Sequence, residues 1–222
     1  MQRDRSDIET AVLPELTDQI ASPRGLRNQL LLQSKITRLS EPHVAPLTSY
    51  IDQLRSAHPE IEFPYFDPDD GGIDAQILFL FEKPGPMSAT TIGQRKGSGF
   101  ISRDNDDPTA QNTFQLMSRA SIPRRSTSTW NIIPGWNGSI KISLQERSFG
   151  LRELDKLTLL FANLKVIVLV GKEAQRASST LESRFKVFKS PHPSNRVKNL
   201  NRSSWDKIPE IWMKAYLSSC TS

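Results

Sequence analysis

The chain of 222 residues carries 29 lysines and arginines against 24 aspartates and glutamates, which gives a formal net charge of +5 at pH 7. Hydrophobic residues make up 36% of the sequence and charged residues 24%, a balance typical of a globular domain with one sizeable core. No apolar run approaches the ~18 residues that a membrane-spanning helix needs, and no apolar signal segment follows Met1. We therefore expect a cytoplasmic protein without a membrane span.

Cysteine and histidine are too scarce for the common metal centres. Cys220 is the only cysteine, and His43, His58 and His192 match no zinc-ligand spacing. We expect chemistry that uses no metal and no other cofactor. The surplus positive charge suits an anionic partner, because basic pairs fall in or beside predicted loops. These pairs are Arg95 with Lys96, Arg124 with Arg125, Lys186 with Lys189, and Arg196 with Lys198.

In chain order, the polar residues 1–25 with their Pro and Gly breakers predict an N-terminal arm, followed by a single domain over residues 26–222. Apolar residues at helical spacing predict two helices, over residues 26–39 and 44–57. Short apolar runs between turn signals then predict strands over residues 75–81, 127–133, 165–170 and 184–189. Helical patterns fall over residues 107–120, 151–163, 172–181 and 205–217.

Strands that alternate with helices predict an α/β fold, in which a mostly parallel sheet is covered on both faces. Ligands bind such sheets beyond the carboxyl ends of the strands. In this sequence those ends carry Glu82, Asn131, Gly171 and the segment Pro191-His-Pro-Ser-Asn-Arg196. The sequence therefore predicts one site at this edge of the sheet.

Two residue types at the predicted edge suit acid–base or electrostatic catalysis. Two prolines flank His192, which gives the imidazole a stiff loop from which to stabilise a departing anion. Glu82 directly follows a strand, where a carboxylate could orient water or stabilise positive charge on a sugar. Asp104, Asp106 and Asp107 compete for that role, although one of them is as easily a helix N-cap before Pro108.

Other residues suit the recognition of a nucleobase. Asn131 lies in a predicted buried strand, where an amide is costly unless its donor and acceptor are used, for example by a base edge. Phe100 lies among glycines, so its ring is a candidate for stacking on a base. Arg196 follows the His192 loop and could brace the gap that a flipped nucleotide leaves in a duplex.

These segments together resemble the uracil-DNA glycosylase superfamily. Glu82-Lys-Pro-Gly is similar to its first active-site motif, and Ser190-Pro-His-Pro-Ser-Asn is similar to its second, the His-Pro-Ser loop. The resemblance extends to a bacterial branch without an iron–sulfur cluster, over roughly residues 30–215. The further shared segments begin at Asp67, Leu80, Gly97, Trp130 and Gly171.

The resemblance implies a three-layer α/β/α sandwich with a four-stranded, mostly parallel sheet. It implies a monofunctional DNA glycosylase, in which water attacks C1′ of a flipped-out nucleotide and leaves an abasic site. Glu82 and His192 would then be catalytic. The base would contact Phe100, Asn131, Lys83 and Gly85. We expect DNA contacts from the loop side chains of Ser194, Asn195, Arg196, Arg95, Lys96 and Lys189, and a monomeric protein that binds single- or double-stranded DNA.

Two positions depart from the motifs. Phe81 stands where the first motif begins with glycine, and Lys83 stands where the most active branch has its water-activating aspartate. These departures leave three hypotheses open. The chain excises uracil or another deaminated base in repair, or attacks a modified viral base in defence against phage, or binds a flipped base without cleaving it. A nucleotide-handling enzyme unrelated to DNA has no Gly-x-Gly-x-x-Gly or P-loop pattern to support it.

Overall fold

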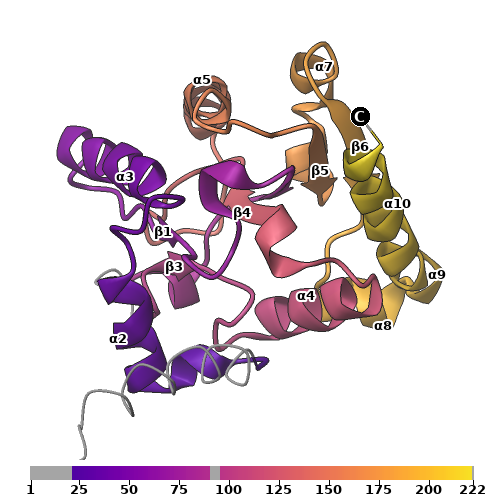
Figure 1. Ribbon diagram of the computed structural model, residues 1–222, viewed down its shortest axis with the longest axis horizontal. Coiled ribbons are helices and arrows are strands. Elements are labelled where there is room, and N and C mark those ends of the chain that lie inside the picture. The colour runs from indigo at the N-terminus through magenta and orange to yellow at the C-terminus, as the bar shows by residue number, and fades with distance from the viewer. Residues whose placement is uncertain (1–21, 91–95, 222) are drawn as a thin grey trace, which may run out of the picture.

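The computed structural model describes residues 22–90 and 96–221. Its centre is a four-stranded, wholly parallel sheet in the order β4-β2-β5-β6 (Figure 1). The strands are β2 (Ile77–Phe81), β4 (Thr127–Asn131), β5 (Val166–Val170) and β6 (Lys186–Ser190). Every residue of β2, β4 and β5 is buried, as expected for inner strands of a sheet that is covered on both faces. The predicted α/β fold is confirmed.

The helices cover both faces of this sheet (Figure 1). The helices of the described ranges are α2 (Gln29–Thr37), which lies away from the sheet, α3 (Ala45–Ala57), α4 (Pro108–Arg119), α5 (Leu144–Thr158), α6 (Lys172–Gln175), α7 (Ser178–Leu181), α8 (Asn195–Leu200), α9 (Arg202–Asp206) and α10 (Ile208–Cys220). A short parallel pair of strands, β1 (Tyr65–Phe66) and β3 (Phe100–Ile101), lies outside the main sheet. Single 3-10 turns occupy Gly25–Arg27, Gly72–Asp74, Pro86–Ser88 and Arg124–Ser126.

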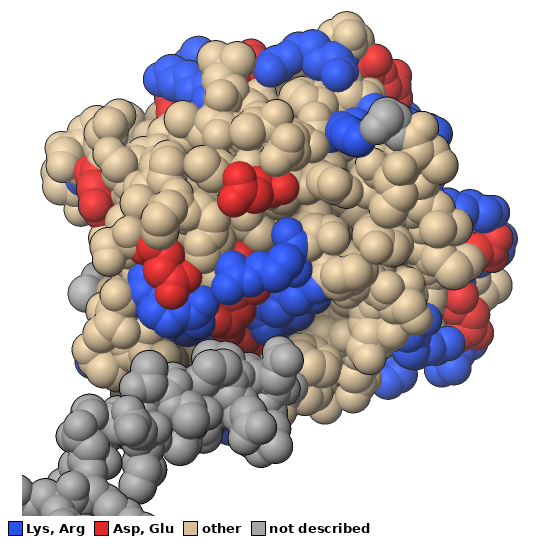
Figure 2. Space-filling model, in the orientation of Figure 1, with Lys and Arg blue, Asp and Glu red and all other residues tan. Residues whose placement is uncertain are grey.

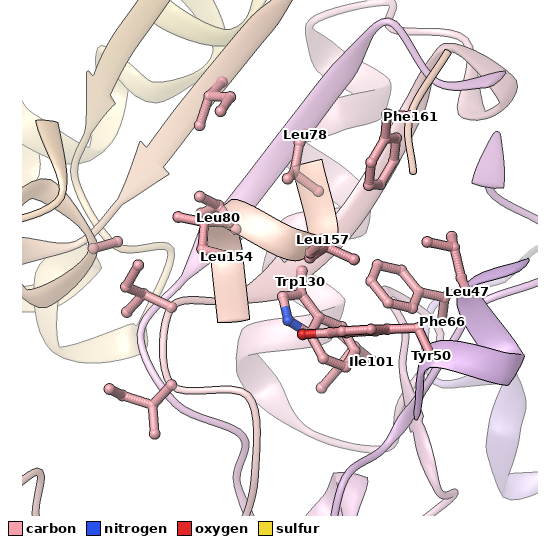
Figure 3. Packing of buried hydrophobic residues seen from close by; sticks show 14 of the residues in the cluster. Leu47, Tyr50, Phe66, Leu78, Leu80, Ile101, Trp130, Leu154, Leu157 and Phe161 are labelled. Carbon is pink, nitrogen blue, oxygen red and sulfur yellow. The ribbon is translucent and has the colours of Figure 1, made fainter. Parts of the chain in front are cut away.

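Alternation along the strands divides the core into two layers. Leu78, Leu80 and Trp130 face α3 and α5, and the Trp130 ring stacks on Phe66 with ring centroids 4.1 Å apart (Figure 3). Phe79 and its same-face neighbours Ile77 and Phe81 pack instead with residues of α4 and α10. The fully buried Trp212 of α10 meets Phe79 edge-on. The result is the expected three-layer α/β/α sandwich.

Some predicted boundaries need correction. Helix α5 begins at Leu144, not at 151, because Ser143 and Glu146 form a capping box that satisfies the first amides of the helix. The helix predicted over residues 172–181 is two short helices, α6 and α7. Helix α8 follows the His192 loop and is absent from the sequence prediction.

Most of the predicted N-terminal arm lies outside the described residues. Where the structure begins to describe the chain, Arg24 donates to Gln111 of α4 at 2.8 Å, so this point of the chain is docked on the domain. In the described ranges, no helix is long and apolar enough to cross a membrane.

Candidate active site

A cavity of about 330 Å³ opens at the carboxyl edge of the sheet, between the ends of β2 and β4 and the start of α4. Four segments that are far apart in sequence line it. They are the loop of residues 83–88 after β2, residues 101–113 with gaps, Thr129 and Asn131 of β4, and His192 after β6. Strands β2 and β4 pair in register, so Phe81 and Asn131 are direct neighbours on the same face of the sheet. The predicted site edge therefore exists as one concave pocket.

Asn131 is the last residue of β4 and is only 6% exposed. Its Oδ1 is fully buried and accepts no hydrogen bond from any residue that the structure describes. A buried amide oxygen without a partner is costly, by about 1–3 kcal/mol, so such a group in a cavity wall favours a ligand that donates to it. The backbone beyond Asn131 remains hydrogen-bonded to the end of β2 and the residue after it. Ile132 donates to the Phe81 carbonyl, and Ile133 donates to the Glu82 carbonyl.

His192 enters the cavity from the loop between β6 and α8, and its ring meets Phe81 edge-on at 5.9 Å. Burial lowers the pKa of His192 below its ordinary value, although the charges of Glu82 and Asp107 act to raise it. The imidazole is therefore neutral at pH 7. A neutral imidazole carries one ring N–H, which can donate to negative charge that develops on a ligand.

The loop that carries His192 is braced from both sides. Asn112 of α4 donates from Nδ2 to the Pro193 carbonyl and to Oδ1 of Asn195, each at 3.0 Å. On the other side Trp212 donates to Oγ of Ser190 at 2.8 Å. These contacts fix the loop without using the imidazole, which leaves His192 available to a ligand.

Glu82 is not among the residues that line the cavity. Its Oε1 instead accepts the amide of Glu173 at the start of α6, at 3.1 Å. Gly171 makes this contact possible, since a Cβ at that position would lie 2.5 Å from Glu82 Oε1, and its φ of +91° favours glycine. The carboxylate thus holds α6 and acts on His192 through its charge.

Lys83 and Gly85 both line the cavity. The ammonium of Lys83, however, is held by Oε1 of Glu146 at 2.5 Å, Oδ1 of Asn137 at 3.0 Å and the Lys141 carbonyl at 2.9 Å. Lys83 therefore ties the first-motif loop to the start of α5. A Cβ on Gly85 would meet nothing within 4 Å, so open space lies directly above this residue.

The structure does not bring Phe100 into the cavity. Its side chain is 1% exposed in β3 and packs against Tyr65 with ring centroids 6.2 Å apart, while the next residue, Ile101, lines the cavity. The aromatic ring in the cavity wall belongs to Phe81. Strand alternation explains this position, because Phe81 ends β2 on the face that Asn131 shares.

The three competing aspartates are separated by the fold. Asp106 pairs with Arg27 at 2.6 Å, and Asp104 belongs to a buried ion cluster. Asp107 caps α4, as one of the three was expected to do, and also lines the cavity. The sequence offered a signal for the cap in Asp107 followed by Pro108, but none for the direction in which the carboxylate faces.

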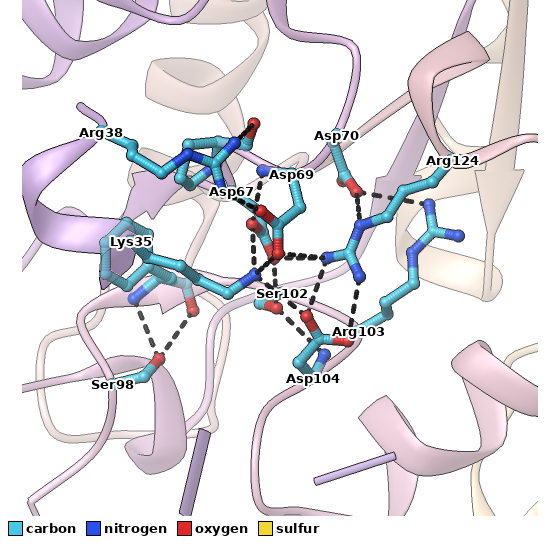
Figure 4. Close-up of polar contacts among 12 residues, drawn as sticks. Lys35, Arg38, Asp67, Asp69, Asp70, Ser98, Ser102, Arg103, Asp104 and Arg124 are labelled. Carbon is cyan, nitrogen blue, oxygen red and sulfur yellow. Dashed lines mark hydrogen bonds and ion pairs between the residues drawn. The ribbon is translucent and has the colours of Figure 1, made fainter. Parts of the chain in front are cut away.

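A buried ion cluster lies beside the cavity (Figure 4). Lys35 donates to Asp67, Asp69 and Asp104 at 2.6, 2.5 and 2.9 Å, and Arg124 pairs with Asp67 and Asp70 at 2.7 and 2.9 Å. Three of these carboxylates lie close enough together to ligate a metal ion, but the Lys35 ammonium already occupies the space between them. The cluster fixes the segment that follows β3, which includes the cavity residues Ser102 and Arg103.

Some of the residues expected to contact DNA make contacts within the protein, and others are exposed. Ser194 caps α8, and Asn195 accepts the Asn112 amide, while Arg196 projects from α8 as an exposed side chain. Lys96 is exposed, Lys189 lies 3.5 Å from Glu182, and Arg95 falls outside the described residues. On the face drawn in Figure 2, basic side chains gather with acidic ones between them, so that face carries no stripe of one sign.

The fold and the cavity define an α/β domain that can receive one planar, polar ligand at the carboxyl edge of its sheet. The family model of the uracil DNA glycosylase superfamily matches residues 68–215, which is 148 of the 222 residues, and the chain belongs to this superfamily. The matched range contains the first-motif loop, Asn131 and the His192 loop. Members of this superfamily are typically glycosylases that act on N-glycosyl bonds, with DNA as the substrate. No curated protein matches the chain by sequence.

Proposed function

We propose that this protein is a monofunctional DNA glycosylase that hydrolyses the N-glycosidic bond of a flipped-out base and leaves an abasic site. The observation that carries the proposal is the unpaired, buried Oδ1 of Asn131 in the wall of a cavity that His192 also lines. A nucleobase supplies the donor that this oxygen lacks, and a nucleotide that is flipped out of DNA can bring its base into such a cavity.

In this reaction the residues divide into recognition and charge stabilisation. Asn131 reads the polar edge of the base, and the ring of Phe81 borders the base in place of the expected Phe100. His192 donates its N–H to the base as the C1′–N bond breaks and negative charge moves onto the leaving group. Gly85 leaves room for the nucleotide above the loop of the first motif.

Uracil is the first substrate to test, and a modified base is the second. The second candidate is favoured by one feature: Thr129 and the buried Arg103 line the same cavity as Asn131. These polar residues offer hydrogen-bond partners for a substituent on a base. Modified phage DNA would be a substrate of this kind.

The test is a panel of single- and double-stranded oligonucleotides that contain uracil, hypoxanthine or 5-hydroxymethylcytosine, together with phage genomic DNA. Alkaline cleavage detects abasic sites, and mass spectrometry identifies the released base. We expect product from the wild-type protein and at least a 100-fold lower rate from His192→Ala and from Asn131→Ala. Tight binding without any abasic site would instead favour a protein that holds a flipped base and does not cleave.

A further inference from the structure

One acidic residue lines the cavity from a fixed position. Of the aspartates and glutamates in the described ranges, Asp107 is the one that lines the cavity. It caps α4, and its Oδ1 accepts the amides of Thr109 and Ala110 at 2.8 and 2.9 Å. No residue that the structure describes donates a hydrogen bond to its Oδ2. One oxygen therefore anchors the side chain, and the other remains as an acceptor.

The surroundings of Asp107 suit a base rather than an inert cap. Burial raises the pKa of Asp107 above its ordinary value, against the lowering effect of the two helix amides and of the nearby Arg24; the charge of Asp106 adds to the increase. A carboxylate with a raised pKa accepts a proton more readily. Asp107 is also close enough to His192 to act on its pKa, so the two side chains belong to one cavity.

The two other candidate side chains, both in the first motif, already have partners within the protein. Glu82 accepts the amide of Glu173 and does not line the cavity, and the ammonium of Lys83 is held by Glu146, Asn137 and a carbonyl. The position after Glu82 therefore supplies no base in this chain. The acid that hydrolysis requires must come from another segment, and Asp107 is the candidate that the geometry offers.

We propose, on the basis of the glycosylase function above, that Asp107 orients the attacking water and accepts its proton. The water oxygen forms a bond to C1′ while the C1′–N bond breaks, and the electron pair of that bond leaves with the base. His192 stabilises the resulting anion, which then takes up a proton from solvent, while Asp107 releases to solvent the proton that it took from the water. The products are the free base and an abasic deoxyribose with a hydroxyl on C1′, so atoms and charge balance.

The test compares Asp107→Asn with Asp106→Asn on the oligonucleotides named above, under single-turnover conditions. Asparagine caps helices about as well as aspartate, so Asp107→Asn keeps the start of α4 while it removes the base. We expect its excision rate to fall at least 100-fold, with a melting temperature within about 3 °C of the wild type. Asp106 is the neighbouring acid, lies outside the cavity lining and pairs with Arg27, and its variant should stay within twofold of the wild-type rate.

The outcomes separate this assignment from the function on which it rests. If the wild type releases a base and Asp107→Asn releases it at a comparable rate, the assignment is overturned and the glycosylase remains. If Asp106→Asn loses as much activity as Asp107→Asn, the loss reflects the segment before α4 and the assignment is again overturned. If the wild type releases no base from any of these DNAs, both proposals fall.

Discussion

Removal of the Lys35 ammonium is the substitution that tests the account of the buried ion cluster most severely. The Lys35 side chain is 6% exposed and is the shared donor for Asp67, Asp69 and Asp104. Around it, Arg38, Arg103 and Arg124 join Lys35, while Asp70 joins the other three aspartates and Glu41 pairs with Arg38. The Lys35→Met variant removes the one ammonium that three of these carboxylates share.

Breaking a buried ion pair from one side costs about 3–5 kcal/mol, because the remaining charge stays buried without compensation. For a domain of this size, that is a fall in melting temperature of roughly 6–20 °C. Urea denaturation at pH 7 measures the change directly. Lys214→Met is the matched control, since Lys214 pairs with Glu210 at a similar distance of 2.7 Å but is 62% exposed.

The control should lose less than about 1 kcal/mol, as exposed pairs do. A loss below about 1 kcal/mol for Lys35→Met would refute the reasoning, because the aspartates would then be satisfied without the ammonium. A loss in both variants of equal size would refute it as well, since burial would not be the deciding factor.

Three further predictions concern the cavity and the titration of its neighbours. Gly85→Val should alter the free energy of unfolding by less than about 1 kcal/mol, since its Cβ meets nothing within 4 Å, but should abolish base excision by filling the cavity; an active variant would show that the base lies elsewhere. Glu82→Gln should lower the pKa of His192 further, because the Glu82 charge acts to raise it, and an NMR titration of the imidazole that shows a rise or no change would contradict this. Burial acts to raise the pKa of Asp67, but the charges of Lys35 and Arg124 outweigh it and hold that pKa below its usual value. A group whose pKa is lower in the folded protein than in the unfolded chain stabilises the fold at pH values above its unfolded pKa, which is about 3.9 for aspartate. This stability should be lost as the pH falls below about 4. The Asp67→Asn variant should flatten that part of a curve of stability against pH.

Strands β2 and β5 of the main sheet were predictable because both are buried on both faces. In a chain of this length, few structures other than a buried strand accommodate continuous apolar runs such as residues 77–81 and 166–170. The carboxyl ends of parallel strands lie at one edge of the sheet, so the sequence alone predicts that Asn131 and His192 lie near the same site, and both line the cavity.

The direction of side chains in the loops was not predictable in the same way. Phe100 is flanked by glycines, which suggested an available ring, but pairing of β3 with β1 turns that ring into the protein and presents Ile101 instead. The ring of Phe81 could have been found, because the last residue of β2 shares a face with Asn131 once the two strands are paired in register.

The choice among the acids required three-dimensional contacts. Glu82 follows β2 and Asp107 precedes α4, both at the carboxyl edge of the sheet. Nothing in their sequence spacing distinguishes them. The amide of Glu173 engages one, and the amides at the start of α4 anchor the other with one oxygen still available. Such distinctions depend on which backbone donors come near each carboxylate, and a single sequence does not contain that information.

The central claim is that one extruded base occupies the cavity that Asn131 and His192 line. The most direct measurement is a crystal structure of the protein with a DNA duplex that contains 2′-deoxy-2′-fluorouridine, whose fluorine slows cleavage of the glycosidic bond. We expect the uracil outside the helix, with its polar edge within about 3 Å of the Asn131 amide and its N1 side toward His192. A uracil that remains stacked in the duplex, or one held at another surface with this cavity empty, would contradict the account.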